Sequence, residues 1–168
     1  LNSAMNSIRS SVHNLHDESE TFREITEGII KDFENCTMEY DMSEIIPNKI
    51  KYCFAAIIKE ALSNVIKHSN ATAVKIVLRE HPALYQLCIE DNGIGLDTSA
   101  INESLRKNEL DFVEKGNSIG LHNINARLKM LYGNQYGMHL ESTLGEGTKV
   151  FMILPDSGED SNNEEKDI

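Results

Sequence analysis

The sequence has few cysteines, no long apolar run and a shortage of basic residues, and each shortage excludes a class of protein. Its three cysteines, Cys36, Cys53 and Cys88, are scattered and form no Cys-x-x-Cys pair. They favour a reduced, intracellular compartment over a disulfide framework or a cysteine metal site. No apolar run approaches the roughly 20 residues that span a bilayer, and there is no signal peptide. Because the chain begins at Leu1, we expect a longer parent protein that carries a membrane anchor elsewhere.

The charge balance is acidic. The chain has 16 Lys and Arg against 27 Asp and Glu, a net charge of −11. Such a balance argues against broad binding to nucleic acid or anionic membranes. The last thirteen residues, 156–168, carry −5 of this charge, and we expect them to form a disordered tail. The hydrophobic content of 40% suits one globular domain before that tail.

The periodicity of apolar residues predicts an α+β protein. Helical spacing is found over 1–19, about 20–34, about 48–67 and 118–133. Strand patterns are found over 36–42, as an edge strand, and over 71–80, 83–91, 137–143 and 147–154. We expect a two-layer sandwich whose mixed, mostly antiparallel sheet is covered by helices on one face. Residues 97–118 are polar and irregular, with at most a short helix near 100–107.

Two glycines follow the strand-like run that ends at Asp91. In "LCIEDNGIGLD" they are Gly93 and Gly95. Glycine costs backbone entropy, so a pair at the end of a strand indicates a sharp turn or a ligand against the main chain.

Four polar residues recur on one side of the long predicted helix. Glu60, Asn64, Lys67 and His68 stand at i, i+4, i+7 and i+8, which places them in a row on an ideal helix. Taken alone, this row fits a solvated surface as well as a binding site.

The order of four short motifs resembles a known ATP-binding domain. E-x-x-x-N-x-x-K-H and D-x-G-x-G are followed by "GNSIGL" at 116–121 and "GEGT" at 145–148. This order resembles the domain shared by histidine kinases, type II topoisomerases, Hsp90 chaperones and MutL proteins. It is known as the GHKL, HATPase_c or Bergerat fold, and the resemblance covers about residues 50–155. The sequence looks most like the catalytic domain of a bacterial sensor histidine kinase. The helix that carries Glu60 and Asn64 is similar to that of NarL- and DesK-type kinases, and the segment from "GNSIGL" to Gly133 is similar to that of YesM/LytS-type kinases.

The resemblance assigns the helix row to ATP and magnesium. It implies that Asn64 offers an oxygen to Mg²⁺ and that Glu60 is the general base. It places Lys67 and His68 near the phosphates.

The resemblance also implies that Asp91 accepts a hydrogen bond from the adenine amine. Gly93 would allow the turn, Gly95 would leave room for the base, and Ile94 would supply apolar contact. A turn-capping role for Asp91 and Asn92 is the alternative.

The last two boxes complete the implied nucleotide site. Gly116, Gly120 and Leu121 match the phosphate-binding box, where a helix start favours anions. Ser118 stands where the family commonly has glycine. Thr148 would hold a water or the adenine edge, although a plain hairpin turn explains "GEGT" equally well.

Residues 97–116 would be the lid over ATP. His122 and Asn123, at the start of the following helix, are expected to be surface or capping residues. His16 lies in a Leu-His-Asp context typical of a phosphorylated histidine. It precedes Asn64 by only 48 positions, so we expect an ordinary linker residue there.

The implied function is that of a histidine kinase catalytic domain. Residues 1–35 would connect it to a dimerisation domain of the parent, 36–155 would bind ATP, and 156–168 would be the tail. The domain would donate the γ-phosphate to a histidine of a homodimeric parent, for transfer to a response regulator, in the cytoplasm. Alternatives are an anti-sigma-type serine kinase, an ATP-driven clamp, and a non-catalytic nucleotide-binding or scaffolding module.

Overall fold

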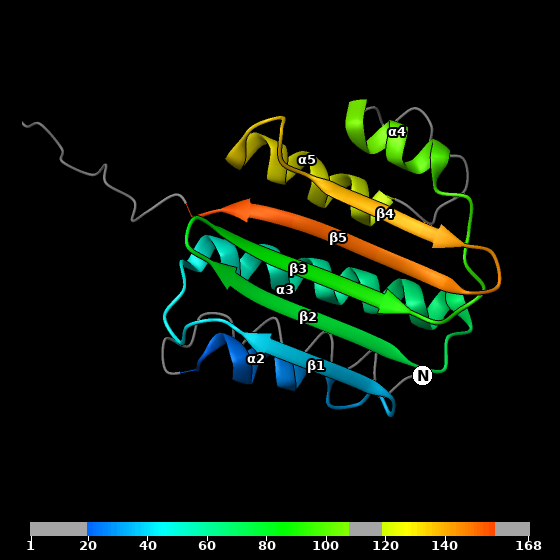
Figure 1. The fold of residues 1–168 in the computed structure, drawn as a ribbon, viewed down its shortest axis with the longest axis horizontal. Coiled ribbons are helices and arrows are strands. Elements are labelled where there is room, and N and C mark those ends of the chain that lie inside the picture. The colour runs from blue at the N-terminus through cyan, green and yellow to red at the C-terminus, as the bar shows by residue number, and fades with distance from the viewer. Residues whose placement is uncertain (1–19, 108–118, 157–168) are drawn as a thin grey trace, which may run out of the picture.

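The structure is a computed structural model that describes residues 20–107 and 119–156 (Figure 1). The elements in chain order are α2 (Phe22–Ile30), β1 (Cys36–Asp41), α3 (Asn48–Asn64), the π-helix η2 (Val65–Ser69), β2 (Val74–His81), β3 (Leu84–Asp91), α4 (Ser99–Lys107), α5 (Ile119–Tyr132), β4 (Met138–Thr143) and β5 (Gly147–Pro155). The helices and strands predicted within these ranges are confirmed. The predicted helix at 1–19, with His16, lies outside the described residues, as do Gly116, Ser118 and residues 157–168 of the acidic tail.

The five strands form one mixed sheet in the order β1-β2-β3-β5-β4. β1 is one edge strand, as predicted, and pairs parallel to β2, whereas the other three pairings are antiparallel. Figure 1 shows α3 and α5 behind one face of this sheet and α4 beside its β4 edge. The predicted two-layer architecture is therefore confirmed.

Alternation along each strand produces the core. Ile76, Leu78 and Leu87 point to the helices and are almost completely buried, because successive strand side chains face opposite sides. Phe54 and Ile57 of α3 pack on them and are also fully buried. This shared core fixes α3 across the sheet.

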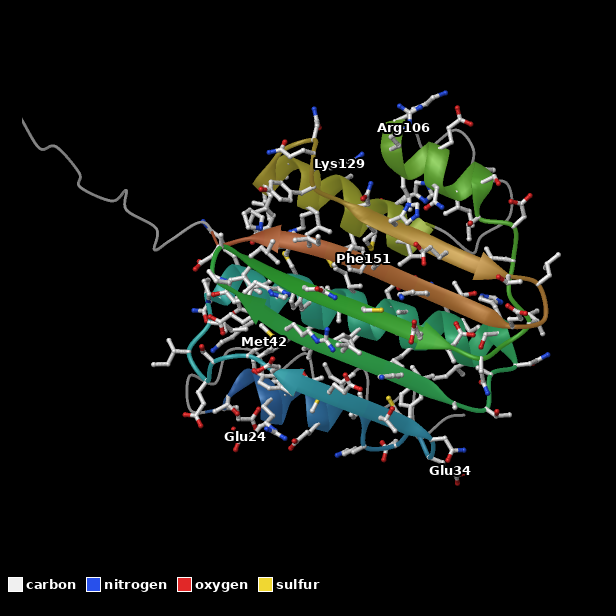
Figure 2. The ribbon with its side chains drawn as sticks, in the orientation of Figure 1. Glu24, Glu34, Met42, Arg106, Lys129 and Phe151 are labelled. Atoms are coloured by element: carbon white, nitrogen blue, oxygen red, sulfur yellow. The ribbon has the colours of Figure 1, made fainter. Side chains whose placement is uncertain are left out.

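The opposite face of the sheet carries no helix in the described part of the chain, and Figure 2 shows Phe151 on it. Ion pairs join neighbouring strands there, with Lys75 Nζ 2.6 Å from Glu39 and Lys149 Nζ 3.1 Å from Glu90. Such exposed pairs contribute little stability.

α2 begins at a capping box, in which the Thr21 side chain accepts from the Glu24 N–H and the Glu24 carboxylate accepts from the Thr21 N–H. Phe22 and Ile29 of this helix are fully buried in the same core. The division of the chain after residue 35 stays a prediction.

Residues 97–107 are more regular than the sequence indicated. α4 fills most of this stretch and buries Ser104 and Leu105, because its polar residues bond to α5 and β4 rather than to water. The described first half of the predicted lid is therefore a packed helix. Among the described helices, none is both long and apolar enough to cross a membrane.

Candidate functional site

A pocket of about 480 Å³ lies between the end of α3, the loop after β3 and the core side of the sheet. Asn64 and Asp91, from elements far apart in the sequence, both line it. The other lining residues are Ala61, Val65, His68, Ser69, Ile89, Ile94, Gly95, Leu96, Ile101, Leu121, Leu140, Thr148 and Val150. Most of this wall is apolar, with a few polar groups, as in small-molecule sites generally.

Asp91 is the acidic group of this pocket. Its Oδ1 accepts a hydrogen bond from the Gly93 N–H at 2.8 Å. Burial raises the pKa of the Asp91 carboxyl above its ordinary value of 3.8, while N–H bonds from Gly93 and Thr148 oppose that rise. The carboxylate is thus held in a partly desolvated position from which it accepts hydrogen bonds.

The glycine turn after Asp91 is bound on two sides. The Ile94 N–H donates to the Ser69 carbonyl and the Gly145 N–H donates to the Ile94 carbonyl, each at 2.8 Å. Gly95 has a φ of +66°, and a Cβ there would collide with the Thr143 carbonyl. The glycine is needed because the turn packs against the β4–β5 hairpin.

The polar row of the long helix is broken by η2. After Asn64 the chain takes the wider π form, closed by i→i+5 bonds, until Asn70 ends it in a left-handed conformation. The residues after Asn64 therefore rotate relative to an ideal α-helix. His68 lines the pocket, whereas Lys67 lies outside its described lining, and both side chains are exposed. The alignment of all four residues stays a prediction.

Glu60 also lies outside the described lining of the pocket, as do Gly93 and Gly120. The Glu60 carboxylate packs against Gly120 in the first turn of α5, and a Cβ at residue 120 would collide with that carboxylate. Of the other predicted residues, Ile94, Gly95, Leu121 and Thr148 line the pocket.

Asn92 has a structural role in the turn. Its Oδ1 accepts from the N–H groups of Thr72 and Ala73, both at 2.9 Å, which joins the start of β2 to the end of β3. His122 is 4% exposed and lies 2.6 Å from Ser104 Oγ, so the surface position expected for it is wrong. Asn123 is exposed as expected.

Sequence reasoning missed Ser142, the residue of β4 that bonds to both the glycine turn and Thr148. It also missed the apolar wall from α4 and β4, which includes Ile101 and Leu140. Strand alternation could have placed Ser142 on the core side, but its partners come from other segments.

A second hollow of about 480 Å³ lies near the same strand ends. Its lining includes Lys75, Glu90 and Lys149, charged residues of the helix-free face. Lys149 and Glu90 already pair at 3.1 Å. Asp91 and Thr148 line both hollows, but most residues around the second are polar or charged, and Asn64 lines only the first. We therefore place the site in the pocket of Asn64 and Asp91.

Comparison with known proteins identifies the family. Residues 53–158 match the model of the histidine kinase-, DNA gyrase B-, and HSP90-like ATPases. The chain belongs to this ATPase family. The predicted resemblance to sensor histidine kinase ATP-binding domains is confirmed, and membership supports the role of an ATP-binding domain.

Several relatives of this ATPase domain are sensor kinases. It is 26% identical to the sensor protein LytS of Bacillus cereus over 124 residues, which are 70% of this chain and 21% of LytS. It is 27% identical over 135 residues to the histidine-protein kinase/phosphatase DegS of Brevibacillus brevis, 80% of this chain and 30% of DegS. The chain thus spans less than a third of the length of these relatives.

Solved structures support the Bergerat fold. The histidine kinase domain of the blue-light activated kinase EL346 from Erythrobacter litoralis superposes with a TM-score of 0.59 at 16% identity, over 92% of this chain and 80% of that one. The catalytic domain of histidine kinase ThkA gives a TM-score of 0.58 at 16% identity, over 86% and 93%. The fold prediction is confirmed.

The residues of the pocket fit a magnesium-bound nucleotide. Within residues 20–107 and 119–156, no group of three or more His, Cys, Asp or Glu side chains is placed to hold a metal ion. Magnesium often takes only one or two protein oxygens, besides phosphate and water. The amide oxygen of Asn64 suits that chemistry, and the apolar walls beside Asp91 suit a base.

Proposed function

We propose that this chain is the catalytic ATP-binding domain of a sensor histidine kinase. It donates the γ-phosphate of ATP to a histidine on the dimerisation domain of its parent, for transfer to a response regulator. The observation that carries the proposal is that Asn64 and Asp91 line one pocket, in a chain of the ATPase family. A homodimeric, membrane-anchored parent with this domain in the cytoplasm is part of the proposal.

The chain's residues divide the nucleotide between them. Asp91 accepts a hydrogen bond from the adenine amine, while Ile94 and Leu121 contact the base from the pocket wall. His68 lines the pocket near the phosphates, and Lys67 acts from the exposed rim as a point charge. Gly116 and Gly120 belong to the phosphate-binding box, where main-chain N–H groups bind anions.

Two residues serve phosphoryl transfer. Asn64 holds Mg²⁺ through its amide oxygen; the ion, when bound, neutralises charge on the phosphates. Glu60 accepts the proton of the attacking imidazole as general base, and its place against α5 orients the carboxylate. Thr148 binds the adenine edge directly or through water.

Phosphotransfer tests the proposal. The chain is mixed with γ-labelled ATP, Mg²⁺ and the dimerisation domain of its parent. We expect an acid-labile label on histidine. Asn64→Asp should reduce transfer by at least about 100-fold while the fold is retained, because charge and geometry at the phosphates change. Asn48→Asp makes the same change at the exposed first residue of α3 and should transfer normally.

Other outcomes favour other functions. Acid-stable label on serine would favour the anti-sigma-type kinase. Binding of ATP without transfer would favour a nucleotide-binding module. An Asn64→Asp variant of full activity would remove Asn64 from the magnesium role.

A further inference from the structure

We infer that Ser142 is a positioning residue that determines nucleobase specificity, by fixing the hydroxyl of Thr148 as an acceptor toward the pocket. The inference rests on the proposed function. It concerns a residue of β4 that none of the four motifs places in the site. The pocket then takes a base that carries an exocyclic amine and rejects one with a carbonyl group there.

Three neighbours surround the Ser142 hydroxyl. Ser142 lies opposite Thr148 in the β4–β5 pairing. Its Oγ is 2.6 Å from the Gly147 carbonyl oxygen, 2.9 Å from the Leu96 nitrogen and 3.0 Å from Thr148 Oγ1. Each distance is within hydrogen-bonding range.

The direction of each bond follows from what the partners can do. A serine hydroxyl has one proton to donate and two lone pairs that accept. The Gly147 carbonyl can only accept, so the Ser142 proton is directed to it. The Leu96 N–H can only donate, so its proton occupies one lone pair of the Ser142 oxygen. One lone pair remains for Thr148, and therefore the Thr148 hydroxyl donates its proton to Ser142.

This arrangement leaves Thr148 with lone pairs to offer the pocket. Thr148 and Asp91 both line the pocket and are paired opposite each other in β3 and β5. The ionised Asp91 carboxylate also only accepts. Two adjacent acceptors favour an amine, or a water that donates to both, and they disfavour a carbonyl oxygen.

Ser142 also positions part of the pocket wall. The Leu96 N–H bond ties the end of the glycine turn to β4, and Leu96 lines the pocket. A purely structural role would act on that wall alone and would weaken all purine nucleotides alike. The positioning role instead changes their relative affinities.

The experiment compares ATP with inosine triphosphate, which has a carbonyl in place of the amine. Calorimetry with Mg²⁺ measures both affinities for the wild-type chain and for Ser142→Ala. Loss of Ser142 frees the Thr148 proton, which can then donate to a carbonyl. We expect the preference for ATP to fall about tenfold, the scale of one hydrogen bond. Ser43→Ala, at an exposed serine toward the other end of the sheet, should keep the wild-type preference.

Thr148→Val supplies a second test. It removes the hydroxyl, so ATP should weaken about tenfold without any gain for inosine triphosphate. Equal weakening of both nucleotides in Ser142→Ala would overturn the inference, because only the wall would have moved.

A nucleotide-free readout separates this inference from the proposed function. In the NMR spectrum of the wild-type chain we expect a slowly exchanging Thr148 hydroxyl proton close to the Ser142 β protons. Its rapid exchange in a folded wild-type chain would overturn the inference. A wild type that binds neither nucleotide would refute the proposed function, and the specificity role would fall with it.

Discussion

Two clusters of polar side chains lie on the core side of the fold, and they use their hydrogen bonds differently. The α4–α5 cluster, comprising Ser104, His122, Asn125 and Lys129, is bonded to protein groups. In the pocket cluster, comprising Asp91, Ser142 and Thr148, the oxygens of Asp91 and Thr148 lie at a cavity. The first holds a helix in place; the second offers sites to a ligand.

The α4–α5 cluster fixes the last turn of α4. Asn125 donates to the Leu105 carbonyl and accepts from the Met138 N–H, both at 2.9 Å. The Lys129 ammonium donates to the carbonyls of Leu105 and Arg106, the negative end of α4, and Figure 2 shows Arg106 and Lys129 on these neighbouring helices. Burial lowers the pKa of Lys129, and the nearby positive charge of Arg106 lowers it further.

The same cluster supports the pocket from outside. α4 supplies Ile101 and α5 supplies Leu121 to the pocket wall. Their positions depend on bonds that no ligand needs to touch. Residues that line the pocket are therefore distinct from residues that hold its wall in place.

The largest expected effect is at the pocket cluster. Asp91→Asn should lower ATP affinity by roughly 100-fold, because an amide replaces a charged acceptor and presents its own donors to the amine. Calorimetry with MgATP measures the change. Asp41→Asn is the matched control, since Asp41 is exposed at the end of β1, at the opposite end of the sheet from Asp91. If Asp91→Asn binds MgATP as tightly as the wild type, the pocket cluster does not bind the nucleotide and does not differ from the α4–α5 cluster in this respect.

The next effect is on stability, at the α4–α5 cluster. Asn125→Ala should lower the free energy of unfolding by about 2 kcal/mol, because the buried Met138 N–H loses its acceptor. Urea denaturation measures this loss. Asn123→Ala, on an exposed position of the same helix, should change it by less than about 0.5 kcal/mol.

Substitutions in the two clusters should also differ in their effect on ATP affinity. Folded Asn125→Ala protein should bind ATP within about threefold of the wild type, because the residue does not line the pocket. A loss of affinity as large as that of Asp91→Asn would mean that the supporting cluster is part of the binding site.

The smallest effect is a pH dependence of stability. Below pH 3.8, the ordinary pKa of aspartate, Asp91 is protonated in both folded and unfolded chains. Above it the unfolded chain releases the proton first, since burial raises the folded pKa. The wild-type free energy of unfolding should therefore fall, relative to that of Asp91→Asn, as pH rises from 3.8 to the raised pKa of the folded chain. Above that pKa the difference should stay constant. Urea denaturation of both proteins from pH 3 to 7 measures it; an opposite slope would contradict the raised pKa.

Local patterns predicted the elements because each depends on residues close in the chain. Pro47 and the apolar residues after it predicted α3, and the pattern of apolar and polar residues predicted all five strands. The position of His122 could not be predicted in this way. Whether that histidine lies at the surface depends on α4, which packs over it and supplies Ser104.

The candidate site was predictable where a motif carries its own chemistry. The roles of Asp91 with its two glycines and of Asn64 in the helix row came from the resemblance of these motifs to a known ATP-binding domain. The π form of η2 was not predicted, because the helical spacing assumes one rotation per residue along the whole helix. Ser142 was missed because its partners, Leu96 and Thr148, come from separate segments.

The order of glycines, acids and apolar repeats was enough to set the elements and the two layers, and the resemblance of its motifs to a known domain named the residues of the proposed nucleotide site. The meeting of Asn64 with Asp91, the burial of His122 and the threefold bonding of Ser142 were decided only when the chain packed. Helix and strand periodicity is a property of neighbouring residues, whereas the partner of a hydroxyl or an imidazole is set by elements that sequence distance does not relate.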